Sequence, residues 1–207
     1  MKVIKANAFI EDKIDGSEII KKIEKIGRVC YKSENNITDD SAERFIKNII
    51  KNGHQSVLEH VSISVRVICD RGVSHEIVRH RIAAYSQEST RYCNYSKDKF
   101  GNEITVIEPL FFEKGSLEYK IWEDTMKEIE KNYFKLIELG RTPQEARSIL
   151  PNSLKTEIVM TMNLREWRHF FKLRASKNAH PQMREVALIM LNLLKDEIPI
   201  VFDDINY

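Results

Sequence analysis

The sequence predicts an α+β fold, a single mixed domain in which several helices flank a small central sheet. Two observations lead to this prediction. Apolar residues recur at helical spacing over much of the chain, and shorter segments alternate with the period of two that is typical of half-buried strands. Strands and helices follow one another irregularly, and no repeat period, Gly/Ser linker or change of composition divides them. We therefore expect residues 1–207 to form one domain.

Three segments are predicted as strands. The clearest is Val61–Cys69, where every second residue from Val61 to Val67 is apolar and the residues between them are Ser or Arg. Leu154–Met162 alternates in the same way, and Ile104–Ile107 is a weaker candidate.

Helical spacing covers more of the chain than strand spacing does. The longest expected helix has an apolar stripe that includes Leu117 and Ile121 and continues through Trp122, Met126 and Tyr133. The expected helices are Ser17–Tyr31, one between Asp40 and Gly53, Ser116–Leu139, a short one between Thr142 and Pro151, one that begins after Asn163, and Pro181–Leu194.

Residues that start and stop helices support these boundaries. Polar pairs three positions apart can cap the first turn, and glycine tolerates the left-handed conformation that closes many helices. The pairs are Asp40 with Glu43, Thr142 with Glu145 and Asn163 with Glu166, and the closing glycines are Gly53 and Gly140.

Length and composition exclude several classes of protein. A chain of 207 residues can bury a sizeable core without disulfides or metals. Hydrophobic residues make up 42% and charged residues 31%, which excludes collagen-like and low-complexity chains. The net charge of +2 is too small to hold nucleic acid or an anionic membrane by a broad field, so anion binding would need a local cluster.

The cysteines indicate a reducing compartment. Cys30, Cys69 and Cys93 are an odd set without CxxC spacing, so we expect a cytoplasmic protein. The N-terminus lacks the apolar core of a signal peptide, and no stretch approaches the ~18 apolar residues of a membrane span. Each cysteine is expected to act as a small hydrophobic residue, Cys69 at a strand end and Cys30 on the apolar face of a helix.

Arginine side chains are the expected anion-binding groups, because the sequence contains neither GxGxxG nor a Walker A loop. The densest supply is Arg79-His80-Arg81, followed by Arg91 after the polar loop Tyr85–Thr90. If a helix continued through the triplet, its side chains would lie about 100° apart and face different bodies. The simpler interpretation of such a triplet is a solvated basic turn.

Metal and thiol chemistry are not expected. His75 and His80 are five residues apart, which places them about 140° apart around a helix, whereas a zincin helix needs histidines four apart. Cys93 lies close to Arg91, and a nearby cation favours a thiolate, but no base accompanies it.

Several segments resemble one enzyme family. The run from Arg79 to Ser89 spells RHR, seven residues and then Ser, which resembles the signature of flavin-dependent thymidylate synthases. Four further segments resemble that family in the same order, so the resemblance extends from about Ile19 to Leu194. They are Gly53–His60, Ala146–Pro151, Asn163–Arg165 and Leu173–Ala175.

The resemblance implies a single catalytic domain that uses FAD to methylate dUMP to dTMP. It implies methylenetetrahydrofolate as the carbon donor, NADPH as the reductant, and a homotetramer whose active sites are shared between subunits. It implies no membrane or nucleic-acid partner.

The resemblance also implies roles for individual residues. Arg174 would lie at the uracil, where a fixed cation stabilises negative charge and makes C5 a better nucleophile, so it is the candidate catalytic residue. Ser89 is expected to position the base. The implied flavin contacts are His54, Ser56, Arg79, His80, Arg81, Gln87, Asn163, Leu164, Arg165 and His169, and the implied dUMP contacts are Glu76, Arg79, Gln87, Glu88, Ser89, Thr90, Arg91, Arg147 and Arg174.

A non-enzymatic nucleotide or single-stranded nucleic-acid binding module is the alternative hypothesis. Its arginines would neutralise phosphates and its tyrosines would stack on bases, with steep salt dependence and no need for flavin. The balanced net charge argues against it. The residues concerned are Arg79, Arg81, Arg91, Tyr85, Tyr92 and Tyr95.

Overall fold

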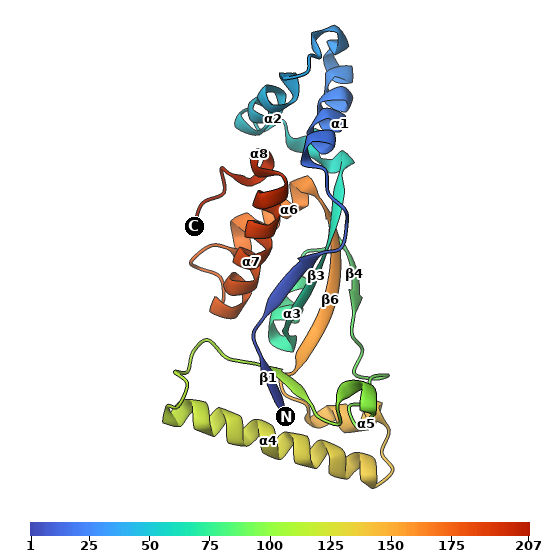
Figure 1. Ribbon diagram of the computed structural model, residues 1–207, viewed down its shortest axis with the longest axis vertical. Helices are drawn as coiled ribbons and strands as arrows, with labels where there is room; N and C mark the ends of the chain where they lie inside the picture. Colours follow the sequence, from blue (N-terminus) through green and yellow to red (C-terminus); the bar gives the residue numbers. More distant parts are fainter. The chain divides into compact units, whose positions relative to one another are not determined.

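The computed structural model describes residues 1–207, with the side chain of every residue except Lys99. Helices and strands are mixed, so the predicted α+β class is confirmed (Figure 1). The chain divides into two compact units. Unit 1 comprises Met1–Asn7, Val67–Arg79 and Ser86–Ile158, and unit 2 comprises Ala8–Arg66, His80–Tyr85 and Val159–Tyr207. The single domain expected over residues 1–207 stays a prediction.

Two sheets are present among the described residues. The larger has the strand order β2-β3-β6-β4, and the smaller pairs β1 with β5 in parallel, with Val3 opposite Val106. The strands are β1 (Lys2–Ile4), β2 (Asn7–Ile10), β3 (Ser62–Asp70), β4 (Ala84–Gln87), β5 (Thr105–Ile107) and β6 (Lys155–Asn163). The long strands β3 and β6 each contribute residues to both units.

The three predicted strands are confirmed as β3, β6 and β5, each within one residue of its expected ends. β1, β2 and β4 were not predicted. The expected polar loop over Tyr85–Thr90 is wrong in its first part, because Tyr85–Gln87 belongs to β4. This strand is partly exposed and carries Ser86 and Gln87, so it lacks the apolar alternation that reveals a half-buried strand.

Unit 2 is mostly helical. Helix α1 packs on α2, and α6 packs on α7 (Figure 1). Ile23, Ile46, Leu58 and Trp167 are fully buried and come from four different elements of this unit. The elements are α1 (Gly16–Arg28), η1 (Val29–Tyr31), η2 (Glu34–Asn36), α2 (Ser41–Lys51), η3 (Gln55–His60), α6 (Leu164–Arg174), α7 (Pro181–Glu197) and α8 (Pro199–Phe202).

Unit 1 is organised around the long helix α4. Its core cluster includes Val106, Trp122, Met126 and Tyr133. The helix begins where the Ser116 side chain accepts a hydrogen bond from the backbone of the first turn. The helical elements are α3 (Arg71–Ile77), η4 (Asp98–Phe100), α4 (Leu117–Glu138), α5 (Pro143–Ala146) and η5 (Arg147–Ile149).

The six predicted helices are confirmed, but three expectations about side chains are wrong. Asp40 does not cap α2, because its carboxylate accepts a hydrogen bond from the Thr38 hydroxyl at 2.7 Å instead. Leu117 and Ile121 are 70% and 60% exposed, because the buried face of α4 is centred on its aromatic residues. Cys30 is exposed, because α1 ends before it and the tighter turn of η1 changes the direction of its side chain.

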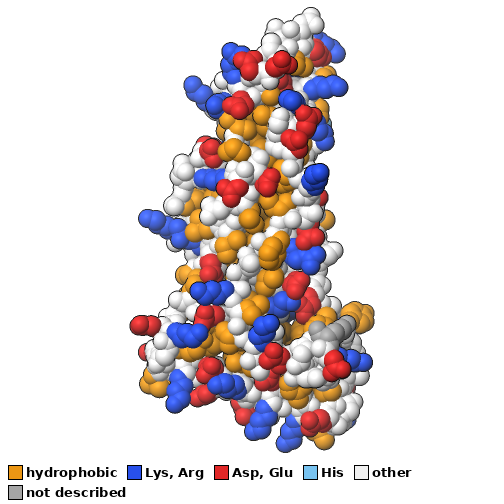
Figure 2. All heavy atoms as spheres, in the orientation of Figure 1, with side chains coloured by type: hydrophobic (Ala, Val, Ile, Leu, Met, Phe, Trp, Pro, Cys, Tyr) orange, Lys and Arg blue, Asp and Glu red, His pale blue; other side chains and the backbone are white. Residues whose placement is uncertain are grey.

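The surface agrees with the charge arithmetic. Basic and acidic side chains are interspersed on the face shown in Figure 2, and their numbers nearly balance over the whole sequence. Among the described residues, no helix combines the length and apolar character needed to cross a membrane. Anion binding on such a surface depends on individual arginines rather than on a broad field.

Candidate functional site

The residues predicted to bind flavin and those predicted to bind dUMP lie mostly in different units. Most expected flavin contacts belong to unit 2, and most expected dUMP contacts belong to unit 1; the exceptions are Arg79, Gln87 and Arg174. Unit 2 holds His54, Ser56, His80, Arg81, Asn163, Leu164, Arg165, His169 and Arg174, and unit 1 holds Glu76, Arg79, Gln87, Glu88, Ser89, Thr90, Arg91 and Arg147.

The basic triplet lies in a turn. Helix α3 ends at Ile77, so the helix does not continue through Arg79, His80 and Arg81. Both arginines are exposed, whereas His80 is only 6% exposed. The Tyr85 hydroxyl donates to the His80 carbonyl oxygen at 2.6 Å and so fixes the backbone here. The helix on which the prediction of different surroundings depended is therefore absent here, and the simpler interpretation, a solvated basic turn, holds for Arg79 and Arg81 but not for the buried His80.

The His80 ring lies between two charged residues of α6. Its Nδ1 is 3.4 Å from Oε1 of Glu166, and its Nε2 accepts a hydrogen bond of 3.0 Å from Nε of Arg174. The ring also meets Phe170 edge-on, with 4.8 Å between ring centroids. Glu166, Phe170 and Arg174 share one face of α6 because they are four residues apart.

The environment of His80 favours its neutral form. Burial, together with Arg174 and His169, lowers the pKa of His80 to about 4. Burial raises the pKa of Glu166, and His169 opposes that change. Burial and the nearby Glu166 raise the pKa of Tyr85 to about 12. At neutral pH, this cluster therefore contains an uncharged imidazole and an uncharged phenol.

Local sequence positions the start of α6. Asn163 accepts a hydrogen bond from the backbone N–H of Glu166 at 2.9 Å, which confirms its predicted role as the N-cap. Trp167 is fully buried and donates from its indole nitrogen to the Ile63 carbonyl at 3.1 Å, which anchors the helix to β3. Leu164 is also fully buried, so any contact it makes with a flavin must come from its backbone.

The other side of α6 is fixed by a buried arginine. Arg168 is 1% exposed, and its two terminal nitrogens donate to the Asp204 carboxylate at 2.6 Å each. Arg168 also donates to the Val201 carbonyl oxygen. The hydrogen bond from Arg168 lowers the pKa of Asp204, and burial opposes that change.

The remaining expected flavin contacts of unit 2 are accessible. His54, Ser56 and Arg165 are all exposed. Arg165 donates to Oε1 of Glu59 at 2.6 Å. An exposed ion pair of this kind contributes about 0–1 kcal/mol, so Arg165 can exchange it for a phosphate at little cost.

In unit 1, Gln87 is held by two hydroxyl groups. Its amide nitrogen contacts Oγ of Ser74 at 2.9 Å and Oγ1 of Thr156 at 3.2 Å. Ser74 and the partly buried Glu76 both belong to α3. Three elements, α3, β4 and β6, therefore fix the orientation of the Gln87 side chain.

Glu88 belongs to an internal network. It accepts hydrogen bonds from the Tyr95 hydroxyl at 3.1 Å and from Lys155 at 3.0 Å, and Lys155 also contacts Glu157 at 2.6 Å. Burial lowers the pKa of Lys155, but its hydrogen bonds to Glu157 and Glu88 raise it overall. Tyr95 is 5% exposed, so it cannot stack on a base as the nucleic-acid alternative requires.

Arg91 and Arg147 lie where the loop that follows β4 contacts α5 and η5. Nη1 of Arg147 is 3.4 Å from Oγ1 of Thr90, and Nε of Arg91 is 3.4 Å from Oε1 of Gln144. The backbone N–H of Arg91 donates to Oγ of Ser89 at 3.3 Å. Arg91 and Arg147 are exposed. Their guanidinium groups suit a phosphate dianion, because each offers a planar fork of donors.

One cluster in unit 2 has the composition of a metal site. His80, Glu166 and His169 each place a ligand atom within 4.8 Å of the others. However, Arg174 already donates to Nε2 of His80, and its positive charge opposes a cation there. The cluster is better explained as a hydrogen-bonded network.

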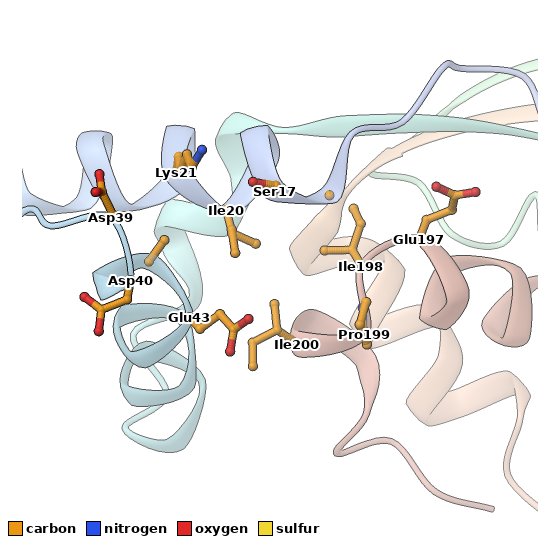
Figure 3. A pocket seen from close by; sticks show the side chains of 12 residues that line it. Ser17, Ile20, Lys21, Asp39, Asp40, Glu43, Glu197, Ile198, Pro199 and Ile200 are labelled. Atoms are coloured by element: carbon orange, nitrogen blue, oxygen red, sulfur yellow. The ribbon is translucent and has the colours of Figure 1, made fainter.

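A pocket of about 710 Å³ in unit 2 contains none of the predicted site residues (Figure 3). It lies between α1, α2 and the segment that leads into α8. Asp39, Asp40, Glu43 and Glu197 line it against a single amine, Lys21. This excess of carboxylates disfavours anionic ligands such as nucleotides.

Sequence reasoning missed several of these neighbours. The sequence predicts Glu166 only as part of a helix cap and gives no sign that Gln144 belongs to a site. Glu166 lies 86 residues from its partner His80, and Gln144 lies 53 residues from Arg91. Local sequence patterns do not predict contacts between residues that are so far apart along the chain.

The fold and these residues define a class, the α+β proteins with exposed arginine side chains and no glycine-rich phosphate loop in the sequence. Comparison with known proteins gives the family. A family model described as thymidylate synthase complementing protein matches residues 14–200. A flavin-dependent thymidylate synthase of Geobacter sulfurreducens is 35% identical over 86% of this chain and 78% of its own length. One of Pyrococcus furiosus is 37% identical over 84% of this chain and 72% of its own length.

A solved structure shares the fold. The UMP/dUMP methylase PolB of Streptomyces cacaoi, bound with 5-Br dUMP, superposes with a TM-score of 0.78 over 98% of this chain and 96% of its own, at 20% identity. The chain belongs to the family of flavin-dependent thymidylate synthases and is an enzyme of that family.

Proposed function

We propose that this enzyme methylates dUMP to dTMP with FAD, taking carbon from methylenetetrahydrofolate and reducing equivalents from NADPH. The observation that carries the proposal is the pair of exposed arginines, Arg91 and Arg147, beside the hydroxyl groups of Ser89 and Thr90. This combination offers two cationic guanidinium groups to the phosphate and the partly exposed Ser89 hydroxyl to the sugar or base, whereas Thr90 is only 6% exposed and holds Arg147. The PolB methylase of the same fold is bound with a dUMP analogue, which supports a nucleotide at this fold.

The exposed residues of unit 2 fit a flavin dinucleotide. Arg81 and Arg165 offer cations to a diphosphate, and Ser56 offers a hydroxyl group. Bound FAD would supply the redox chemistry that arginine, serine and histidine side chains lack. In this proposal, His54 and His169 complete the flavin surface, and Arg79 and Gln87 of unit 1 contact both ligands.

Arg174 is the proposed catalytic residue. Uracil is a weak carbon nucleophile, and a guanidinium at the ring stabilises the negative charge that develops as C5 attacks. Arg174 is partly buried, which strengthens its interaction with a developing charge compared with an exposed arginine. The proposal needs no cysteine nucleophile: Cys69 is buried, and burial raises the pKa of its thiol. We further propose a cytoplasmic homotetramer with shared sites.

A visible spectrum tests the proposal first. The purified protein is incubated with excess FAD, freed of unbound cofactor, and measured before and after dUMP is added. We expect a retained flavin band that shifts with dUMP, followed by dTMP formation when both co-substrates are present. A folded protein that retains no flavin, or that binds flavin without any response to dUMP, contradicts the proposal.

Replacing the catalytic arginine tests the mechanism. Arg174→Ala should lower kcat for dTMP formation by about 100-fold or more, in the range seen when a charge-stabilising donor is removed. Arg184→Ala is the matched control, because Arg184 also uses its Nε, donating to the Ala175 carbonyl at 3.0 Å. Near-normal turnover of the Arg174 variant would remove this residue as the activator.

A further inference from the structure

We propose that Glu166 and neutral His80 form a hydrogen-bonded chain that positions the guanidinium of Arg174 for the reaction at the uracil. His80 is then a positioning residue, in addition to any contact it makes with flavin. The inference rests on the proposed role of Arg174.

Hydrogen-bond chemistry fixes the tautomer of His80. An arginine Nε can only donate, so Nε2 of His80, 3.0 Å away, must accept. A neutral imidazole carries a single proton, which therefore resides on Nδ1. That nitrogen faces Oε1 of Glu166 at 3.4 Å, and a carboxylate oxygen accepts such a proton. Because Nε of Arg174 can only donate, it determines which atom donates and which accepts in both contacts of the His80 ring.

His80 bridges two residues that lie about two turns apart on α6. Glu166 and Arg174 are eight residues apart on α6, about 12 Å along the helix axis, which is too far for a direct ion pair. His80 comes from a different segment and contacts both. Every part of this chain lies in unit 2.

The surroundings hold the imidazole in place. His80 is 6% exposed, Phe170 packs against the ring edge, and the Tyr85 hydroxyl holds its backbone carbonyl. The titratable and charged groups that face it are Glu166, His169 and Arg174 from α6 and Tyr85 from β4. The lowered pKa of His80 supports the neutral form, because an imidazolium would point a second donor at Arg174.

The consequence concerns the orientation of Arg174. The hydrogen bond from its Nε to His80 restricts the rotation of the guanidinium group. A guanidinium that is already oriented needs less reorganisation when charge develops on the ring.

A double-mutant cycle tests this coupling, with flavin retention measured for every variant and kcat measured at saturating FAD. His80→Phe keeps an aromatic ring without an acceptor and should lower kcat about tenfold, the effect of losing one hydrogen bond to a charged group. His80→Gln places an amide oxygen near the position of Nε2 and should recover most of that loss. In an Arg174→Ala background, His80→Phe should change kcat by less than about twofold.

A control variant and two contrary outcomes separate the positioning role of His80 from the proposed function. His60→Phe changes an exposed histidine of the same unit and should leave kcat unchanged. If the effects of the His80 and Arg174 variants multiply independently, the positioning role fails while the proposed function stands. If Arg174→Ala alone leaves kcat unchanged, the proposed catalytic role fails first.

Nitrogen-15 NMR of histidine-labelled enzyme provides a measurement that does not depend on activity or on a folded variant. We expect the His80 signals of the wild-type enzyme at neutral pH to show a protonated Nδ1 and an unprotonated Nε2, because Nε of Arg174 can only donate to Nε2. A protonated Nε2, whether in the other tautomer or in the imidazolium, would overturn the inference.

Discussion

Arg147 provides the most direct test of the phosphate site. It is exposed at the start of η5, and its Nη1 makes a long contact of 3.4 Å with Oγ1 of Thr90. Removal of such a surface group costs about 0–1 kcal/mol of folding stability. Arg147→Ala should therefore fold normally, so that its kinetics report on binding.

The size of the effect follows from the ligand. A hydrogen bond between a guanidinium and a phosphate dianion contributes about 1.5–3 kcal/mol. At about 1.4 kcal/mol for each factor of ten, Arg147→Ala should raise the KM for dUMP roughly 10- to 100-fold. Because the phosphate takes no part in the chemistry at C5, kcat should change little.

The assay compares dUMP with deoxyuridine, which lacks the phosphate. Steady-state rates are measured for both substrates in the wild type and in Arg147→Ala. The control is Arg141→Ala, a nearby exposed arginine that is 3.8 Å from Glu145. The penalty should appear with dUMP and vanish with deoxyuridine. An equal penalty with both substrates, or an unchanged KM for dUMP, would refute the phosphate role of Arg147.

Three further predictions concern stability and chemistry. Asp204→Asn leaves the buried Arg168 without its carboxylate and should cost roughly 2 kcal/mol at pH 7. Because Arg168 lowers the pKa of Asp204, this stabilisation is complete above the ordinary Asp pKa of about 4 and is lost as the pH falls from there through the lowered pKa of the folded protein. The free energy of urea unfolding should therefore fall less between pH 7 and pH 3 in Asp204→Asn than in the wild type, and an equal fall would contradict this role of Asp204. Cys93→Ser should retain dTMP formation, since Cys93 packs partly buried against the unit 1 core; complete loss of turnover with flavin still bound would restore the nucleophile hypothesis. Ser116→Ala removes the side chain that accepts from the backbone of Tyr119 at 3.1 Å and should lower the free energy of unfolding by about 1 kcal/mol, and an unchanged urea midpoint would contradict this role as the cap of α4.

Short-range signals in the sequence predicted most of the helices and the two long strands. The Thr142 and Glu145 pair forms the expected capping box at the start of α5, and Asn163 caps α6. The same reasoning failed at Asp40, because its carboxylate accepts a hydrogen bond from the Thr38 hydroxyl instead of from the backbone N–H groups at the start of α2. It also failed at β4, because a partly exposed strand does not need apolar alternation.

By itself, the sequence determined the fold class, the positions of most helices and the family, because periodicity, most caps and the RHR signature are encoded within short windows of residues. Only the tertiary structure decided that His80 is buried between Glu166 and Arg174, and that Arg91 and Arg147 share a surface. The physical reason is distance along the chain. Contacts between residues more than 50 positions apart depend on how whole elements pack, and that packing also sets burial, tautomer and pKa.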